Sequence, residues 1–150
     1  LPEATGLGVD IAAGAAGIAA QNAVALGLAT RAHFMVWDLF TPLSPEARFD
    51  AVLSNPPYIP SADLAGLDPE VRLFDPPRAL DGGADGLDFY RRIIEPAPEF
   101  LTSGGLLAFE VGQGQAQDVA RIMAARGFGA IETFNDLGGI ERVVTGRGPA

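Results

Sequence analysis

The stretch FDAVLSNPPY, residues 49–58, contains the features from which the fold class and the candidate site are predicted. Residues 49–54 are mostly apolar and β-prone, which is typical of a short buried strand. Residues 55–58 follow directly and form an Asn-Pro-Pro-Tyr motif, whose two prolines fix φ and remove two backbone donors. The strand is therefore predicted to end in a rigid turn that presents carbonyl oxygens without competing N–H groups.

The chemistry of this motif suits a planar amino group. Asn55 adds a carboxamide oxygen, Pro56 and Pro57 leave backbone carbonyls as acceptors, and Tyr58 adds a flat face for stacking. Two acceptors and a ring can hold an N–H₂ group from its edge and its face. The alternative reading is a rigid turn that only leads the chain away from the strand.

The rest of the chain alternates between strand and helix patterns. Residues 55–86 are rich in Pro, Gly and Asp and too long to be an idle loop. Pro96 is expected to kink a helix. We predict strands at residues 7–11, 32–36, 49–54, 106–111, 130–134 and 142–145, and helices at residues 12–26, 87–101 and 115–126. This order predicts an open, mostly parallel α/β sheet with an antiparallel C-terminal strand.

Open α/β sheets bind ligands at the carboxyl ends of their strands, where two acids join the motif. Asp10 lies at the end of the first strand. It can accept hydrogen bonds from the ribose hydroxyls of a nucleoside cofactor, or it caps the following helix. Asp38 follows the second strand and can accept an adenine amino group, or it caps the turn before Pro42. We expect both acids to share one cleft with the motif.

Lesser features have plainer readings. His33 lies inside an apolar strand and is expected to be an ordinary core or surface histidine. The glycines around Asp81, Asp85 and Asp88 do not have EF-hand spacing, so a turn with a helix cap is expected there. Residues 112–114, Gly-Gln-Gly, are expected to be the next strand–helix turn.

Composition excludes several classes of function. The 150 residues carry a formal net charge of -9, with 19 acids against 10 basic residues, all of them arginine. This balance makes nucleic-acid binding an unfavoured prediction. Without cysteine or lysine, and with one histidine, thiolate or multi-histidine metal sites and Schiff-base chemistry are excluded, and no metal is expected. We see no membrane span and no signal peptide, so a cytoplasmic location is expected.

Several separated segments resemble the HemK/PrmC family of peptide-chain release factor glutamine methyltransferases. The segment around the motif, residues 52–60, is similar to motif IV of amino-methylating enzymes that use S-adenosylmethionine. The other matching segments are residues 70–76, 79–92 and 141–147. The resemblance implies a Rossmann-like class I methyltransferase fold and methylation of the glutamine side-chain amide in the Gly-Gly-Gln motif of release factors. Alternatives are a ribosomal-protein glutamine methyltransferase, a DNA adenine-N6 methyltransferase and a non-catalytic protein-binding fragment.

The resemblance also implies a role for each candidate residue. Asp10 would hold the cofactor ribose, and Asp38 with Leu39 would border the adenine. Asn55 would touch both cofactor and substrate. The catalytic residues would be Asn55, Pro56 and Tyr58, and together with Pro57 they would bind the substrate amide.

The family's first strand, its glycine-rich loop and its N-terminal helical domain are not recognised in residues 1–150. We therefore expect a partial methyltransferase catalytic domain, truncated at its N-terminus. The unrecognised strand is expected between the strand that ends near Asp10 and the strand that ends at Ser54. Alone, these residues are expected to bind S-adenosylmethionine weakly or not at all.

Overall fold

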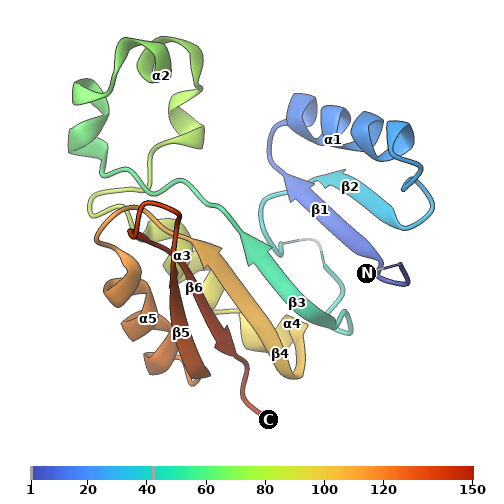
Figure 1. The fold of residues 1–150 in the computed structure, drawn as a ribbon. Coiled ribbons are helices and arrows are strands. Elements are labelled where there is room, and N and C mark those ends of the chain that lie inside the picture. Colours follow the sequence, from blue (N-terminus) through green and yellow to red (C-terminus); the bar gives the residue numbers. More distant parts are fainter. Residues whose placement is uncertain (1, 42) are drawn as a thin grey trace. The chain divides into compact units, whose positions relative to one another are not determined.

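The computed structural model describes residues 2–41 and 43–150, apart from the side chain of Leu73. The chain divides into two compact units, Leu1–Ser44 and Pro45–Ala150, which are described separately. Figure 1 shows the helices and strands of both units.

The first unit is a strand–helix–strand unit. Strand β1 (Gly6–Asp10) and strand β2 (Ala32–Val36) pair in parallel, and helix α1 (Ala13–Ala25) connects them. Gly27, at φ +70°, ends the helix with a left-handed turn that glycine adopts without strain. The three predicted elements of this unit are confirmed to within one residue at each end.

The second unit contains a four-stranded sheet in the order β3-β4-β6-β5. Strands β3 and β4 are parallel, whereas β6 runs antiparallel to both β4 and β5. This arrangement confirms the mostly parallel sheet with an antiparallel C-terminal strand. The bounds are β3 Phe49–Ser54, β4 Leu101–Glu110, β5 Gly129–Asn135 and β6 Glu141–Arg147.

The core of this unit is formed by the sheet, by buried side chains of residues 87–97, and by helix α5 (Ala116–Ala125), which packs on β5 and β6. The amphipathic pattern of α5 buries Val119 and Met123 completely. The largest fully buried side chains are Tyr90, Ile94, Leu107, Phe109, Val111, Val119, Met123 and Val144.

The helix predicted at residues 87–101 is present as two helices, and the disruption expected at Pro96 is confirmed. The structure has α3 (Asp88–Ile94) and α4 (Ala97–Phe100), because Pro96 has no N–H to continue the first helix. The strand predicted at residues 106–111 begins earlier, since Leu101 already pairs with Phe49. The register is irregular between the Phe49–Leu101 and Ala51–Leu106 pairings, and Gly104 has φ +70°. The early part of β4 therefore shows no regular strand pattern in the sequence.

Residues 60–80, called the arm below, leave the motif and return to it (Figure 1). The arm contains the 3₁₀ helices η1 (Ser61–Gly66) and η2 (Pro77–Ala79), with helix α2 (Pro69–Phe74) between them. A β-bridge between Ile59 and Asp81 closes its base. This passage was predicted to be more than an idle loop, but none of these helices was predicted from the sequence.

Within the described part of the chain, every helix is too short or too polar to cross a bilayer.

Candidate functional site

The Asn-Pro-Pro-Tyr motif lies at the carboxyl end of β3. Because Ser54 pairs with Phe109 of the parallel strand β4, Asn55 follows β3 where Glu110 ends β4. Asn55 is exposed and Pro56 is buried, and Tyr58 is half-buried. The motif therefore has a fixed centre and an accessible polar end.

A hollow of about 320 Å³ opens at this edge of the sheet. Leu53, one of the residues that line it, is 74% exposed. The hollow is lined by Leu53, Ser54, Asn55, Ala108, Phe109, Glu110 and Val143. Of the motif, it is the exposed Asn55 that reaches the hollow.

Backbone hydrogen bonds join the segment after Tyr58 to the end of the arm. The N–H of Ile59 donates to the Leu80 carbonyl at 3.0 Å, and the Gly82 N–H donates to the Ile59 carbonyl at 2.8 Å. The hydroxyl of Ser61 also donates to Asp81 Oδ1 at 2.7 Å. This bond and the N–H of Gly83 hold the pKa of Asp81 below its ordinary value. Tyr58 thus precedes a paired segment of backbone.

Glycine is required beside Tyr58. A Cβ at Gly82 would lie 2.8 Å from the Cα of Tyr58, and a Cβ at Gly112 would lie 2.9 Å from its Cδ2. Both distances are too short for real carbon contacts, so larger residues would displace the tyrosine. The glycines that sequence analysis read as turns also make room for the motif.

The turn predicted near Asp85 is confirmed, whereas the predicted helix cap is wrong, since α3 follows Leu87 without a side-chain cap. Asp85 accepts the N–H of Leu87 at 3.1 Å and pairs with Arg91 at 2.6 Å, which fixes the start of α3. The hydrogen bond from Arg91 is the main cause that lowers the pKa of Asp85 to about 2.

The other candidate residues belong to the first unit. Asp10 ends β1, and its neighbour in the sheet is Val36, so Asp10 and Asp38 lie at the same edge of that sheet. Asp10 Oδ1 accepts the N–H of Ala12, the residue before α1, at 2.7 Å, and the carboxylate is exposed. Helix α1 itself has no side-chain cap, so the cap reading is wrong. Leu39 has φ +53°, a conformation that sequence analysis did not anticipate.

The structure therefore groups the candidate residues by unit. Asn55, Pro56, Pro57 and Tyr58 are together in the second unit, and Asp10, Asp38 and Leu39 are together in the first. One cleft shared by all of them stays a prediction, as do the cofactor roles of the acids.

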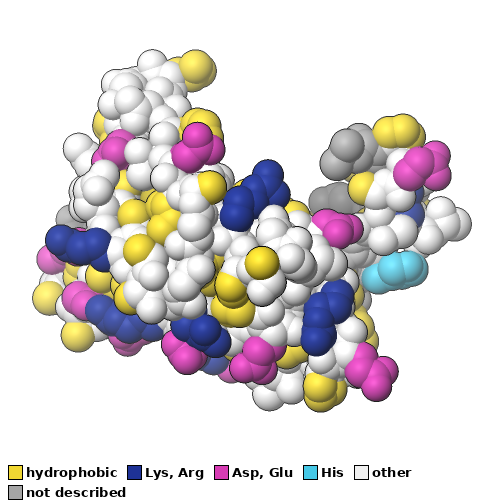
Figure 2. Space-filling view, turned by 90° about the horizontal axis from the view of Figure 1, so that it is seen from below, with side chains coloured by type: hydrophobic (Ala, Val, Ile, Leu, Met, Phe, Trp, Pro, Cys, Tyr) yellow, Lys and Arg dark blue, Asp and Glu magenta, His cyan; other side chains and the backbone are white. Residues whose placement is uncertain are grey.

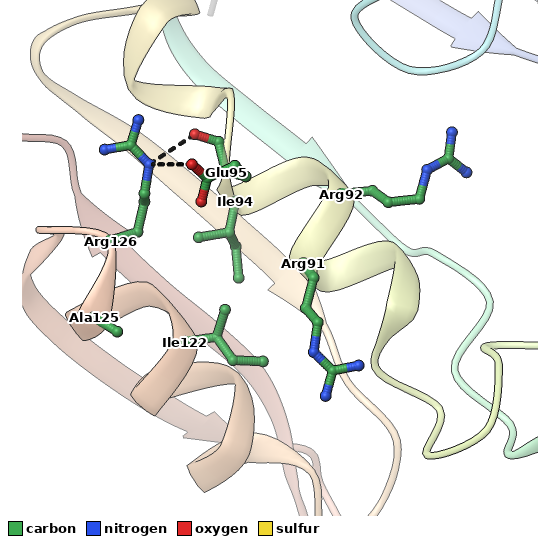
Figure 3. Close-up of a pocket in the computed structure, with 7 residues that line it drawn as sticks. All are labelled: Arg91, Arg92, Ile94, Glu95, Ile122, Ala125 and Arg126. Carbon is green, nitrogen blue, oxygen red and sulfur yellow. Dashed lines mark hydrogen bonds and ion pairs between the residues drawn. The ribbon is translucent and has the colours of Figure 1, made fainter.

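A larger hollow of about 520 Å³ lies between α3 and α5. Figure 3 shows Arg126 turned toward Glu95, while Arg92 extends away from α5. Arg126 Nε donates to the Glu95 carbonyl at 2.8 Å and lies 3.5 Å from its carboxylate. No motif residue lines this hollow, so its size does not make it the candidate site.

Charge on the face shown in Figure 2 is mixed. Arginine side chains lie among acidic ones there, without a continuous basic stripe. A stripe of that kind is the usual electrostatic footprint of a nucleic-acid surface.

One residue beside the motif, Gln115, was not predicted from the sequence. Gln115 directly precedes α5, and its side chain reaches the backbone of Tyr58. The sequence did offer a signal. Gln115 has both donor and acceptor atoms and lies three positions after Gly112, in the turn that follows β4.

The sequence is similar to several curated proteins over nearly all of its length, although no family model matches it. It is 53% identical to the release factor glutamine methyltransferase of Rhodospirillum rubrum, covering 97% of this chain and 44% of that protein. It is 49% identical to the protein of the same name from Geobacter sulfurreducens, covering 98% of this chain and 51% of that protein. The chain thus spans about half the length of these relatives.

Solved structures show the same fold. A methyltransferase from Pyrococcus furiosus aligns with a TM-score of 0.68 at 13% identity, covering 96% of this chain and 62% of that one. A release factor-specific protein-(glutamine-N5) methyltransferase from Alicyclobacillus acidocaldarius aligns with a TM-score of 0.52 at 25% identity. The alignment covers 98% of this chain and 81% of that one. Over the part that it spans, the chain is similar in sequence to proteins named release factor glutamine methyltransferase and shares its fold with solved methyltransferases.

Proposed function

We propose that this chain is part of an enzyme that methylates the side-chain amide nitrogen of the glutamine in the Gly-Gly-Gln motif of peptide-chain release factors. The observation that carries the proposal is the Asn-Pro-Pro-Tyr motif, rigid at Pro56 and exposed at Asn55, at the carboxyl end of β3. The similarity to proteins named for this reaction supports the choice of substrate.

The motif suits the chemical difficulty of the reaction. An amide nitrogen is a poor nucleophile, because its lone pair is delocalised into the carbonyl. The Asn55 carboxamide oxygen and the Pro56 carbonyl would accept its two N–H bonds and stabilise the positive charge that grows on nitrogen. Tyr58 would cover the face of the amide and hold its orientation for in-line transfer.

The acids of the first unit fit a nucleoside cofactor. Asp10 is an exposed carboxylate at a strand end, and its oxygens would accept hydrogen bonds from the ribose hydroxyls. Asp38 lies at the same edge and would accept the adenine amino group, with Leu39 beside the ring. S-adenosylmethionine would supply the methyl group when bound.

We also propose that residues 1–150 form a partial catalytic domain. The match to about half of each relative supports this proposal. Release factors act in translation, so the reaction would take place in the cytoplasm with a protein partner. Calorimetry tests the partial-domain proposal: micromolar binding of S-adenosylmethionine by the 150-residue chain would contradict it.

The substrate is tested with the complete enzyme that contains this chain and methyl-labelled S-adenosylmethionine. Four substrates are offered separately: release factor, the same factor with its Gly-Gly-Gln glutamine changed to alanine, ribosomal proteins, and duplex DNA. We expect label on the unchanged release factor alone. Label on DNA or on a ribosomal protein instead would replace the proposal with one of its alternatives.

A further inference from the structure

The side chain of Gln115 bridges three loops around Tyr58. Its Nε2 donates to the Tyr58 carbonyl at 2.9 Å and lies 3.5 Å from the Gly86 carbonyl. Its Oε1 accepts the N–H of Gly112 at 3.1 Å. A single half-buried amide thus joins the motif, the turn before α3 and the turn after β4.

The backbone of Gln115 gives this amide a firm base. Its N–H donates to the Gly112 carbonyl at 3.1 Å, and its carbonyl accepts the N–H groups of Asp118 and Val119 at the start of α5. Val119 is fully buried in the core. The helix start is therefore fixed by packing, and the Gln115 side chain extends from it.

The motif needs a donor from outside itself. Pro56 and Pro57 have no N–H, so the turn has more carbonyl acceptors than donors of its own. Gln115 supplies a donor to the last carbonyl of the motif, that of Tyr58.

Only glutamine, among side chains of this length, meets both requirements. Nε2 faces two carbonyls and Oε1 faces an N–H, so a carboxylate would place negative charge against the carbonyls of Tyr58 and Gly86. Glycine is needed on either side of the amide. A Cβ at Gly86 would lie 2.6 Å from Nε2, and a Cβ at Gly112 would lie 2.6 Å from Oε1.

We propose that Gln115 is a positioning residue, which fixes the backbone of Tyr58 so that its ring covers the substrate amide. The proposal rests on the proposed function for its catalytic consequence. Gln115 acts through Tyr58 and touches no reacting atom. Its loss should therefore weaken catalysis toward the protein substrate and leave the affinity for the methyl donor unchanged.

The first test reads the contact itself in the 150-residue chain. Tyr58 and Tyr90 are its two tyrosines, so labelling the tyrosine carbonyl with ¹³C gives two signals. We expect Gln115→Met to shift the Tyr58 carbonyl signal and to leave that of Tyr90 in place. The matched control is Gln117→Met on α5, since Gln117 is exposed and its Nε2 lies 3.5 Å from Glu141. An unmoved Tyr58 signal in Gln115→Met overturns the proposal.

The second test measures methylation of release factor by the complete enzyme. We expect Gln115→Met to lower kcat/KM for release factor by up to about a hundredfold, the cost of a misplacement of about 1 Å. The KM for S-adenosylmethionine should stay within about twofold, by the same argument that Gln115 acts only on Tyr58. Gln115→Glu should be the more damaging variant, and Gln117→Met should behave as wild type.

The outcomes separate the two proposals. A shifted Tyr58 signal with unchanged kcat/KM would overturn the positioning role. Wild-type enzyme that leaves release factor unlabelled would refute the proposed function, and the carbonyl signal would still decide whether Gln115 holds Tyr58. If Gln115→Met fails to fold, the same carbonyl signal is read in Gln115→Asn, which keeps a neutral amide but shortens the side chain by one methylene.

Discussion

The phenol of Tyr90 donates a hydrogen bond of 3.0 Å to the backbone carbonyl of Glu110. The ring of Tyr90 is fully buried and meets Phe109 edge to face, with centroids 5.3 Å apart. This pair of contacts ties α3 to the carboxyl end of β4, next to the motif. Burial raises the pKa of the Tyr90 phenol above its ordinary value.

The raised pKa of Tyr90 predicts a loss of stability at alkaline pH. The unfolded chain releases this proton near the ordinary value of 10.0, whereas the folded chain retains it to higher pH. The contribution is therefore complete below pH 10 and falls as the pH rises toward the folded pKa. Thermal unfolding between pH 8 and about 11.5 measures it, and the absence of lysine leaves few other groups titrating there.

The matched variant is Tyr90→Phe. At neutral pH it should lower the free energy of unfolding by about 1 kcal/mol, the net value of one hydrogen bond. Its stability should decline less steeply above pH 10 than that of the wild type. An equally steep decline would show that Tyr90 is not the source.

Asn55→Ala should separate activity from stability. Asn55 is exposed, so its removal should change the free energy of unfolding by no more than about 0.5 kcal/mol. In the complete enzyme, kcat should fall by about a hundredfold or more, since the variant lacks a hydrogen-bond acceptor that stabilises the positive charge developing on nitrogen. Chemical denaturation and methylation kinetics on the same preparation check the pair of values. If kcat and the free energy of unfolding fell in the same proportion, the role proposed for Asn55 would be contradicted.

Asp85→Asn should change the response to acid. With the folded pKa lowered to about 2, Asp85 contributes stability above its ordinary value of 3.8 and loses it as the pH falls through about 2. We expect the midpoint of thermal unfolding to fall less between pH 5 and 2 in Asp85→Asn than in wild type. Asp63→Asn is the control of equal charge change, at an exposed position in η1, and should retain more of the wild-type slope.

Gly86→Ala should destabilise the second unit. Gly86 has φ +75°, and its new Cβ would collide with the Tyr58 carbonyl as well as with Gln115. Strain of this kind costs about 1–3 kcal/mol. Gly66→Ala is the matched control, since nothing lies within 4 Å of its Cβ position. Urea unfolding of both variants compares them, and equal stabilities would refute the close packing around Tyr58.

Gly14→Ala and Gly17→Ala should stabilise helix α1. Both glycines lie inside this helix, and a Cβ at either position meets nothing within 4 Å. Each change should add about 0.5–1 kcal/mol through the helix propensity of alanine. Circular dichroism during thermal unfolding measures the gain, and a loss of helicity would show an unforeseen contact.

Sequence patterns predicted the strands and helices with clear periodicity. Residues 32–36 and 49–54 matched β2 and β3 at both ends, because their apolar runs stop at polar or turn-forming residues. The motif was found for the same reason, as it follows β3 without a gap. Its position at the carboxyl end of a parallel strand is confirmed.

The contacts around Tyr58 could not be predicted in this way. Gln115 meets Tyr58 across 57 positions of sequence, and nothing local distinguishes its side chain from that of Gln117. The helices of the arm were missed because they are short and depend on prolines at their starts, as at Pro69 and Pro77. Local periodicity carries no information on either kind of feature.

The β-bridge between Ile59 and Asp81 has a consequence for how this protein can change over evolutionary time. Because the two ends of the arm are held together at its base, closing a longer or shorter arm alters the loop entropy only slowly with length. Insertions, deletions and substitutions between these ends can therefore accumulate with little effect on the placement of Tyr58. Under the proposed function, such changes would fit the same motif to differently shaped protein substrates.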